Sequence, residues 1–163
     1  MTRWRTLDQQ TVRDLLTRLR GLDWGWTAAE VPDVARRLGW TIIADLPGAG
    51  AAADAGLGLG GQEATFVYRG DDVDRLKIDA TGNTGAETPQ AQAFVHDAFA
   101  DLVATATDLY GPPDRTVHDG YPRALWQDDR TTLTITGGGV AVLVTLKPNE
   151  RQQYWDRVEA TQA

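Results

Sequence analysis

The sequence predicts an α+β domain in which a largely antiparallel sheet of about six strands packs against a long central helix. Short strand-like runs come in consecutive threes joined by tight turns, which favours antiparallel pairing. Between the two triplets, apolar residues recur at helical spacing over 89–110. A length of 163 residues with 42% hydrophobic residues suits one core without disulfides, so residues 1–163 are expected to form a single domain.

Two short helices are expected before the first strand. The first follows the capping-box pattern of Thr6 and Gln9 and ends at Gly21. The second follows a similar pattern at Thr27 and Glu30 and ends at Gly39. The bend between them contains two tryptophans that are expected to fill the junction with the sheet, Trp24 and Trp26.

Six segments have the alternation or β-branched composition of strands: 40–46, 64–69, 73–80, 123–127, 131–136 and 140–147. The Gly/Ala-rich segment 48–61 is expected to be a loop or a frayed edge. Thr88 as N-cap and Pro89 at the first position begin the long helix. Its apolar stripe includes four residues expected to be buried against the sheet: Phe94, Phe99, Leu102 and Val103. A last helix after Pro148 completes the order ααβββαβββα.

The composition excludes several kinds of catalytic site. The chain has no cysteine, which excludes thiolate metal sites and cysteine nucleophiles. It also has no serine, which excludes Ser-His-Asp chemistry. Of the two histidines, His96 and His118, the first lies on the long helix without a partner at metal-binding spacing. We therefore expect no enzymatic activity, no metal and no cofactor.

Two motifs resemble ligand-binding loops only in part. Segment 56–61 matches GxGxxG, but a strand follows it where the dinucleotide fingerprint needs a helix, so it is interpreted as a loop. Segment 71–74 resembles a fragment of a calcium loop without the required glycine and closing glutamate. It is interpreted as a hairpin turn, although paired carboxylates also serve glycosidases.

Charge and hydropathy narrow the choice of partners. A net charge of −7 repels phosphate, so we expect no binding to nucleic acid. The same charge attracts a basic protein partner, although it is also typical of soluble proteins in general. No stretch is long and apolar enough to be a signal peptide or a membrane span, so a cytoplasmic protein that does not bind membranes is expected.

Several short motifs carry a family resemblance: Trp4-Arg5 with Leu7, Leu22–Trp26, Val31-Pro32, Arg37–Trp40 and Phe94–Phe99. With these motifs the chain resembles an uncharacterised family of small acidic actinobacterial proteins. The resemblance covers most of the chain and implies lineage and fold, and it carries over no active site. The element order is also similar to type III secretion chaperone-like domains and to several toxin-immunity folds, an analogy of fold alone.

Together these observations favour a non-enzymatic protein-binding module, with an immunity protein that neutralises a toxin as the leading hypothesis. A secretion chaperone for an exported client is the alternative, and a small-ligand binder or an enzyme with an unrecognised site is a third possibility. The partner-binding residues are predicted at two acidic turns and a neighbouring tryptophan: Asp71, Asp72, Asp74, Trp126, Asp128 and Asp129. The carboxylates would steer a basic partner, and the indole would anchor it.

Overall fold

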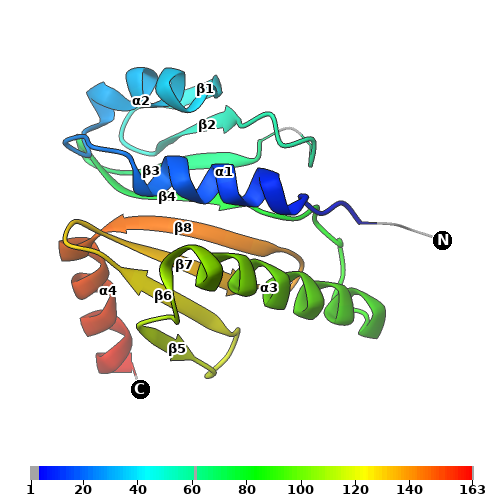
Figure 1. Ribbon diagram of the computed structural model, residues 1–163. Coiled ribbons are helices and arrows are strands. Elements are labelled where there is room, and N and C mark those ends of the chain that lie inside the picture. Colours follow the sequence, from blue (N-terminus) through cyan, green and yellow to red (C-terminus); the bar gives the residue numbers. More distant parts are fainter. Residues whose placement is uncertain (1–3, 61, 163) are drawn as a thin grey trace.

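The computed structural model of the protein describes residues 4–60 and 62–162; residues 1–3, 61 and 163 lie outside the description (Figure 1). The helices are α1 Gln9–Arg20, the 3-10 turn η1 Ala28–Glu30, α2 Val31–Leu38, α3 Pro89–Tyr110 and α4 Asn149–Gln162. The strands are β1 Thr41–Leu46, β2 Gly50–Asp54, β3 Ala64–Arg69, β4 Asp72–Asp79, β5 Arg115–Val117, β6 Arg123–Gln127, β7 Thr131–Gly137 and β8 Val142–Pro148.

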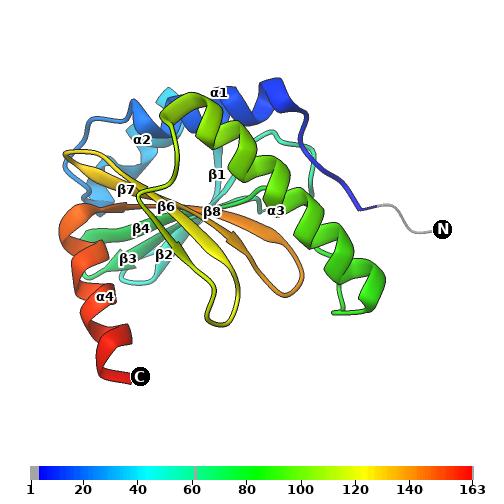
Figure 2. The ribbon, with the colours of Figure 1, turned by 60° about the horizontal axis from the view of Figure 1, so that its bottom comes forward.

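One antiparallel sheet organises the molecule, in the order β1-β2-β3-β4-β8-β7-β6-β5. Two four-stranded meanders are joined where β4 pairs with β8. The helices α1, α2 and α3 cover one face of the sheet, and α4 lies on the other (Figures 1 and 2). The predicted α+β class and antiparallel sheet are confirmed, but the predicted count of six strands is wrong because the described sheet has eight.

The first missed strand, β2, lies in the Gly/Ala-rich segment that was expected to be a loop or frayed edge. It is an inner strand between β1 and β3, and Ala51 and Ala53 face the core with almost no exposed surface. A Cβ on Gly50 would lie 2.5 Å from the carbonyl oxygen of Phe66, so glycine is needed for the close approach of β2 to β3. The composition therefore reflects tight packing rather than flexibility. The second missed strand, β5, has only three residues and lies at the sheet edge.

Helix α3 begins as predicted, with the Thr88 side chain accepting a hydrogen bond from the Ala91 amide and Pro89 in the first turn. Its buried face is made mostly of small residues: Ala91, Val95, Ala98, Leu102, Thr105 and Ala106. Leu102 is buried as expected, but Phe94, Phe99 and Val103 are only partly buried. The reason is that the small residues carry α3 onto the sheet, whereas the two phenylalanines lie at its margins, against Trp4 and Gly137.

Near α1 and α2, one local signal differs from the predicted one and two agree with it. The N-cap of α1 is Asp8, which accepts a hydrogen bond from the Thr11 amide, and not Thr6. The C-cap Gly39 has a left-handed φ of 76°, which is the backbone conformation expected there. Trp24 packs edge-on against Phe66 of β3 with ring centroids 6.3 Å apart, so it fills the predicted junction with the sheet.

Candidate functional site

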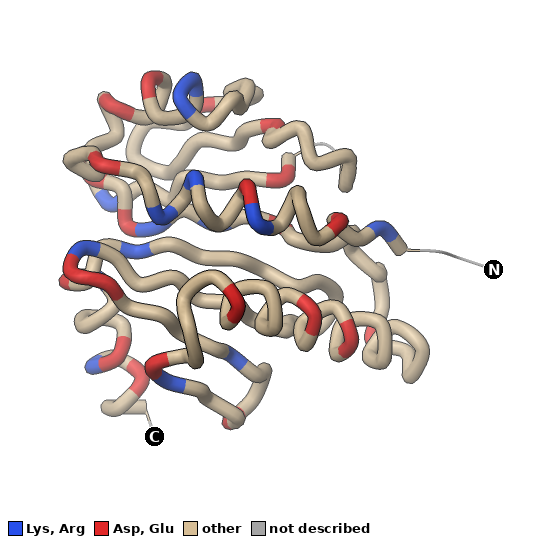
Figure 3. Tube along the Cα trace, in the orientation of Figure 1, with Lys and Arg blue, Asp and Glu red and all other residues tan. Residues whose placement is uncertain are grey.

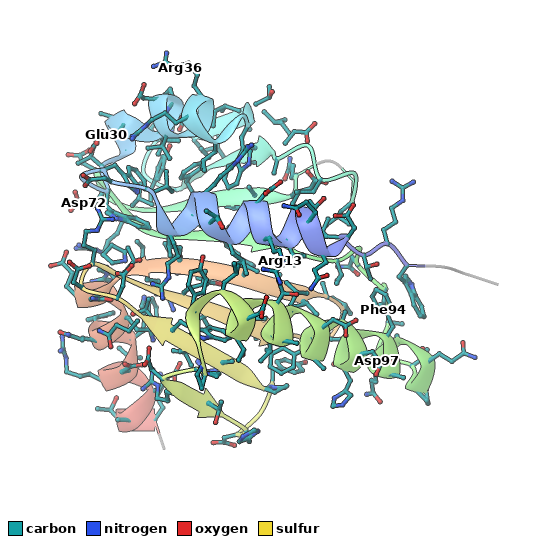
Figure 4. The ribbon with its side chains drawn as sticks, in the orientation of Figure 1. Arg13, Glu30, Arg36, Asp72, Phe94 and Asp97 are labelled. Carbon is teal, nitrogen blue, oxygen red and sulfur yellow. The ribbon has the colours of Figure 1, made fainter. Side chains whose placement is uncertain are left out.

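The two acidic turns lie at the same end of the sheet (Figure 1). Asp71 and Asp72 belong to the β3–β4 turn, and Asp128 and Asp129 belong to the β6–β7 turn. All except Asp128, which is partly buried, are exposed. In Figure 4, Asp72 marks this end of the molecule.

Arginines pair with two of the four carboxylates at this end of the sheet. Asp72 lies 3.7 Å from Arg69, and Asp128 lies 3.3 Å from Arg20. Partial burial acts to raise the pKa of Asp128, but the amides of Thr131 and Arg130 and the nearby arginines hold it below its ordinary value. Asp128 thus closes its own turn, as aspartate does in many turns.

Asp74 is buried and therefore does not face a partner. It lies in a β-bulge, because Tyr68 pairs with Val73 and Val67 pairs with Arg75, so that Asp74 has no opposite residue. Its carboxylate lies 2.7 Å from Arg151 and 2.8 Å from Arg75, and it accepts a bond from the Trp155 indole. The predicted partner-binding role of Asp74 is corrected to a structural one, since an internal ion-pair network holds it.

Trp126 is also buried, with 2% of its surface exposed, on the face of β6 that is covered by α1, α2 and α3. Its indole N–H donates a hydrogen bond of 2.9 Å to the carbonyl of Gly111, just after α3. The predicted aromatic anchor is therefore a core residue that fixes the end of α3 to the sheet. Without Trp126, the predicted site keeps only carboxylates that lie wholly or partly at the surface: Asp71, Asp72, Asp128 and Asp129.

The GxGxxG-like segment encloses an anion that belongs to the chain itself. The buried carboxylate of Glu63 accepts hydrogen bonds from the amides of Ala55, Leu57 and Leu59 at 3.2, 3.0 and 2.6 Å. Gly56 and Gly58, between these amides, have left-handed φ values of 69° and 73°. These alternate amides point at one carboxylate and form a nest-like anion site, and Glu63 fills it. Gly61 of the motif lies outside the described residues.

A cavity of about 540 Å³ opens between α1 and α3. Its lining includes the apolar side chains of Leu7, Val12 and Leu102 together with polar ones such as Thr81 and Thr105. Asp101 and Asp108 belong to its α3 wall. An ion pair between Arg13 of α1 and Asp108 spans the two helices, and Figure 4 shows Arg13 in the space between them.

Helix α3 carries negative charge only. Its 22 residues include Asp97, Asp101 and Asp108 and no lysine or arginine. Figure 3 shows these acidic positions along the tube of α3, and Figure 4 shows Asp97 projecting on the side away from α1. Within the described residues, neither Asp97 nor Asp101 has an ion-pair partner, in contrast to Asp72 and Asp128. Sequence reasoning missed this surface, although the lack of Lys and Arg in 89–110 was a readable signal.

The cavity thus combines apolar lining residues with the unpaired carboxylate of Asp101, which suits a cation on a short aliphatic stem. His96, one of the considered metal ligands, is exposed on α3. Within residues 4–60 and 62–162, no group of three or more His, Asp and Glu side chains is placed to hold a metal ion. The helices of that same part include none long and apolar enough to cross a bilayer.

Comparisons with known proteins bear on the lineage. No curated protein and no solved structure gives a significant match to the chain. A family model described as a family of unknown function (DUF6301) matches residues 10–148. The matched stretch contains all eight strands and the facing sides of α1 and α3, and it ends where α4 begins. The predicted membership in an uncharacterised family is confirmed: the chain belongs to the family of unknown function DUF6301.

Proposed function

We propose that the protein is a non-enzymatic binding module for a basic protein partner, and that it acts as an immunity protein that neutralises a toxin. The observation that carries the proposal is the acidic α3 wall of the α1–α3 cavity. It provides the exposed carboxylate of Asp101, which has no ion-pair partner among the described residues, beside a hollow in which a side chain can lie. We therefore propose that the interface lies on α3 rather than at the two acidic turns.

The chemistry of the cavity favours a lysine or arginine side chain from the partner. The aliphatic stem would lie on Leu7, Val12 and Leu102, and the charged head would reach Asp101. A net charge of −7 adds long-range attraction, which raises association rates with basic proteins. Binding of this kind needs no catalytic group.

The distribution of exposed apolar side chains supports an inhibitor over a secretion chaperone. A chaperone for unfolded clients needs a broad apolar surface. Among the described residues, the exposed large hydrophobic side chains are Ile43, Leu46, Tyr121 and Tyr154. Two of them lie on β1, while the other two lie in distant parts of the chain.

A small organic cation is a second candidate ligand, because the cavity volume of about 540 Å³ falls in the range of small-molecule sites, roughly 300–1,000 Å³. Agmatine provides a guanidinium on a four-carbon stem and mimics the tip of an arginine. Titration calorimetry with agmatine should show binding that Asp101→Asn abolishes. If agmatine does not bind, the small-cation alternative is refuted.

The main proposal is tested by capture of a partner from native cytoplasm, followed by surface-plasmon kinetics with the captured protein. The key variant is Asp97→Asn/Asp101→Asn. The matched control is Asp71→Asn/Asp129→Asn, which removes two other exposed carboxylates that have no ion pair in the described structure. We expect the α3 variant to slow association and flatten its dependence on salt, whereas the turn variant leaves both unchanged. If only the turn variant slows association, the interface lies at the acidic turns and not on α3.

A further inference from the structure

The two edges of the sheet differ in how they are protected. β5, at one edge, has three residues, and its Arg115 forms an ion pair of 2.9 Å with Asp156 of α4. β1, at the other edge, has six residues and pairs with β2 alone among the described strands (Figure 1). An edge strand presents unpaired backbone N–H and C=O groups, which form a template for another strand. β1 is therefore the longer and more accessible of the two templates.

The side chains of β1 leave this edge uncovered. Five of its six residues are exposed, and Ile42 is the one that is partly buried against the core. Ile43 and Leu46 are 49% and 64% exposed, and they are the exposed large aliphatic residues of the described structure. Natural edges avoid pairing with bulges, lysines and prolines. β1 has a bulge between Ile42 and Ala44, but it has no lysine and no proline.

The hairpin formed by β1 and β2 carries negative charge only. Residues 38–68 include no lysine or arginine, although the chain has 16 of them. Asp45 of β1 and Asp54 of β2 are exposed, and neither forms an ion pair in the described structure. Asp45 accepts a bond of 3.1 Å from the Tyr68 hydroxyl, which leaves its charge uncompensated. A segment added to this edge would meet carboxylates without a competing cation on the hairpin, which favours lysine or arginine in that segment.

We propose that β1 is a docking edge for an extended, basic segment of a partner protein, which adds to the sheet as one more strand. Main-chain hydrogen bonds to β1 would supply most of the affinity. Apolar side chains of the segment would lie against Ile43 and Leu46, and a lysine or arginine would lie beside Asp45. No residue that lines the α1–α3 cavity belongs to β1 or β2, so the inference does not rest on the proposed function.

The structure favours a segment of a partner over a second copy of the chain. A stable interface buries about 1,200–2,000 Å² in total. Two paired edges of six residues would be in contact over only about 20 Å of strand. Each copy would also bring a net charge of −7 and its own Asp45 to that contact. Like charges oppose self-pairing, whereas a basic segment meets the opposite charge.

The test uses the full chain and a fluorescent eight-residue peptide that alternates lysine with valine. A control peptide has the same side chains but carries N-methyl groups on its internal amides, so it cannot donate main-chain hydrogen bonds. In fluorescence anisotropy, the first peptide should bind about tenfold tighter than the control or more, because strand addition needs these donors. Equal binding of the two peptides would show adsorption by charge alone and would overturn the proposal.

Variants of the protein test whether the peptide binds at β1. Ile43→Lys introduces an edge-protecting charge at an exposed position, so it should abolish binding and leave the urea midpoint unchanged. Asp45→Asn should weaken binding about two- to fivefold. Asp97→Asn, the matched charge change on α3, should leave binding unchanged. Binding that is equal in all three variants would contradict docking at β1.

Two further measurements identify the surface and the occupant. Saturation with the lysine–valine peptide should slow hydrogen exchange of the β1 amides and leave the β5 amides unchanged. Slower exchange confined to α1 and α3 would mean that the peptide binds at the cavity, which would overturn this proposal and support the proposed function. Sedimentation should show a monomer at the concentrations used for binding. A dimer that Ile43→Lys separates would assign the edge to a second copy and would also overturn the proposal.

Discussion

Replacement of Trp126 by alanine should destabilise the fold and leave the association rate with a partner unchanged. A tryptophan buries about 150–250 Å². At about 25 cal/mol per Å², this corresponds to roughly 4–6 kcal/mol. Alanine retains part of the contact, so the expected loss is about 3–5 kcal/mol of unfolding free energy. That is a large share of the roughly 5–15 kcal/mol that stabilises a typical domain.

Trp126→Phe separates the contribution of aromatic packing to the unfolding free energy from that of the hydrogen bond. It keeps most of the aromatic packing but leaves the Gly111 carbonyl without the indole donor, at a cost of about 1–3 kcal/mol. Tyr121→Ala is the control, because Tyr121 is 54% exposed and should lose less than about 1 kcal/mol. Urea denaturation followed by circular dichroism measures all three. A Trp126→Ala variant as stable as the unmodified protein, with faster release of a bound partner, would refute the core assignment.

Three other perturbations test separate features. Burial acts to raise the pKa of Asp74, but bonds from Arg151, Arg75 and Trp155 hold it below 3.8. The stabilisation by this carboxylate is therefore present above that pH and is lost as the pH falls through the folded-state pKa. In urea titrations, the difference in unfolding free energy between the unmodified protein and Asp74→Asn should close below about pH 4. Gly50→Ala should lower the unfolding free energy by about 1–3 kcal/mol in the same assay, because its Cβ would collide with the Phe66 carbonyl oxygen. Gly56→Asn should lower it by less than about 1 kcal/mol, because asparagine tolerates a left-handed backbone. Burial and the bond to Asp45 raise the pKa of Tyr68 to about 12. The contribution of Tyr68 to the unfolding free energy should therefore be full below pH 10.0 and fall between pH 10.0 and about 12. Absorbance titration of the protein against Tyr68→Phe identifies this phenol, and its ionisation near pH 10.0 would contradict the assignment.

The sequence predicted the parts of the fold that local chemistry determines. Thr88 and Pro89 marked the start of α3, Gly39 marked the end of α2, and alternation located six strands. β2 was missed because close approach to β3 selects Gly and Ala there, the same residues that flexible loops use. β5 was missed because three residues are too short to show a period.

The site was less predictable because it depends on how distant residues meet. Asp74 looked like a surface turn residue, since nothing local reveals a bulge that turns it toward Arg151, 77 residues later. Trp126 near a turn gave no sign of its bond to Gly111. The acidic α3 wall was visible in composition, but its role depends on the cavity that forms only when α1 packs alongside.

The self-filled nest around Glu63 has a consequence for motif searches. A pattern search for GxGxxG tests the glycines and ignores the source of the anion, so it flags this chain together with nucleotide-binding proteins. Here the same alternation of glycines with inward amides is followed by a glutamate four residues after Leu59, and then by a strand. A search rule that rejects matches in which an acidic residue and a strand follow the glycines at once would remove such false positives. It would also collect a separate class of loops whose order depends on a carboxylate of their own chain.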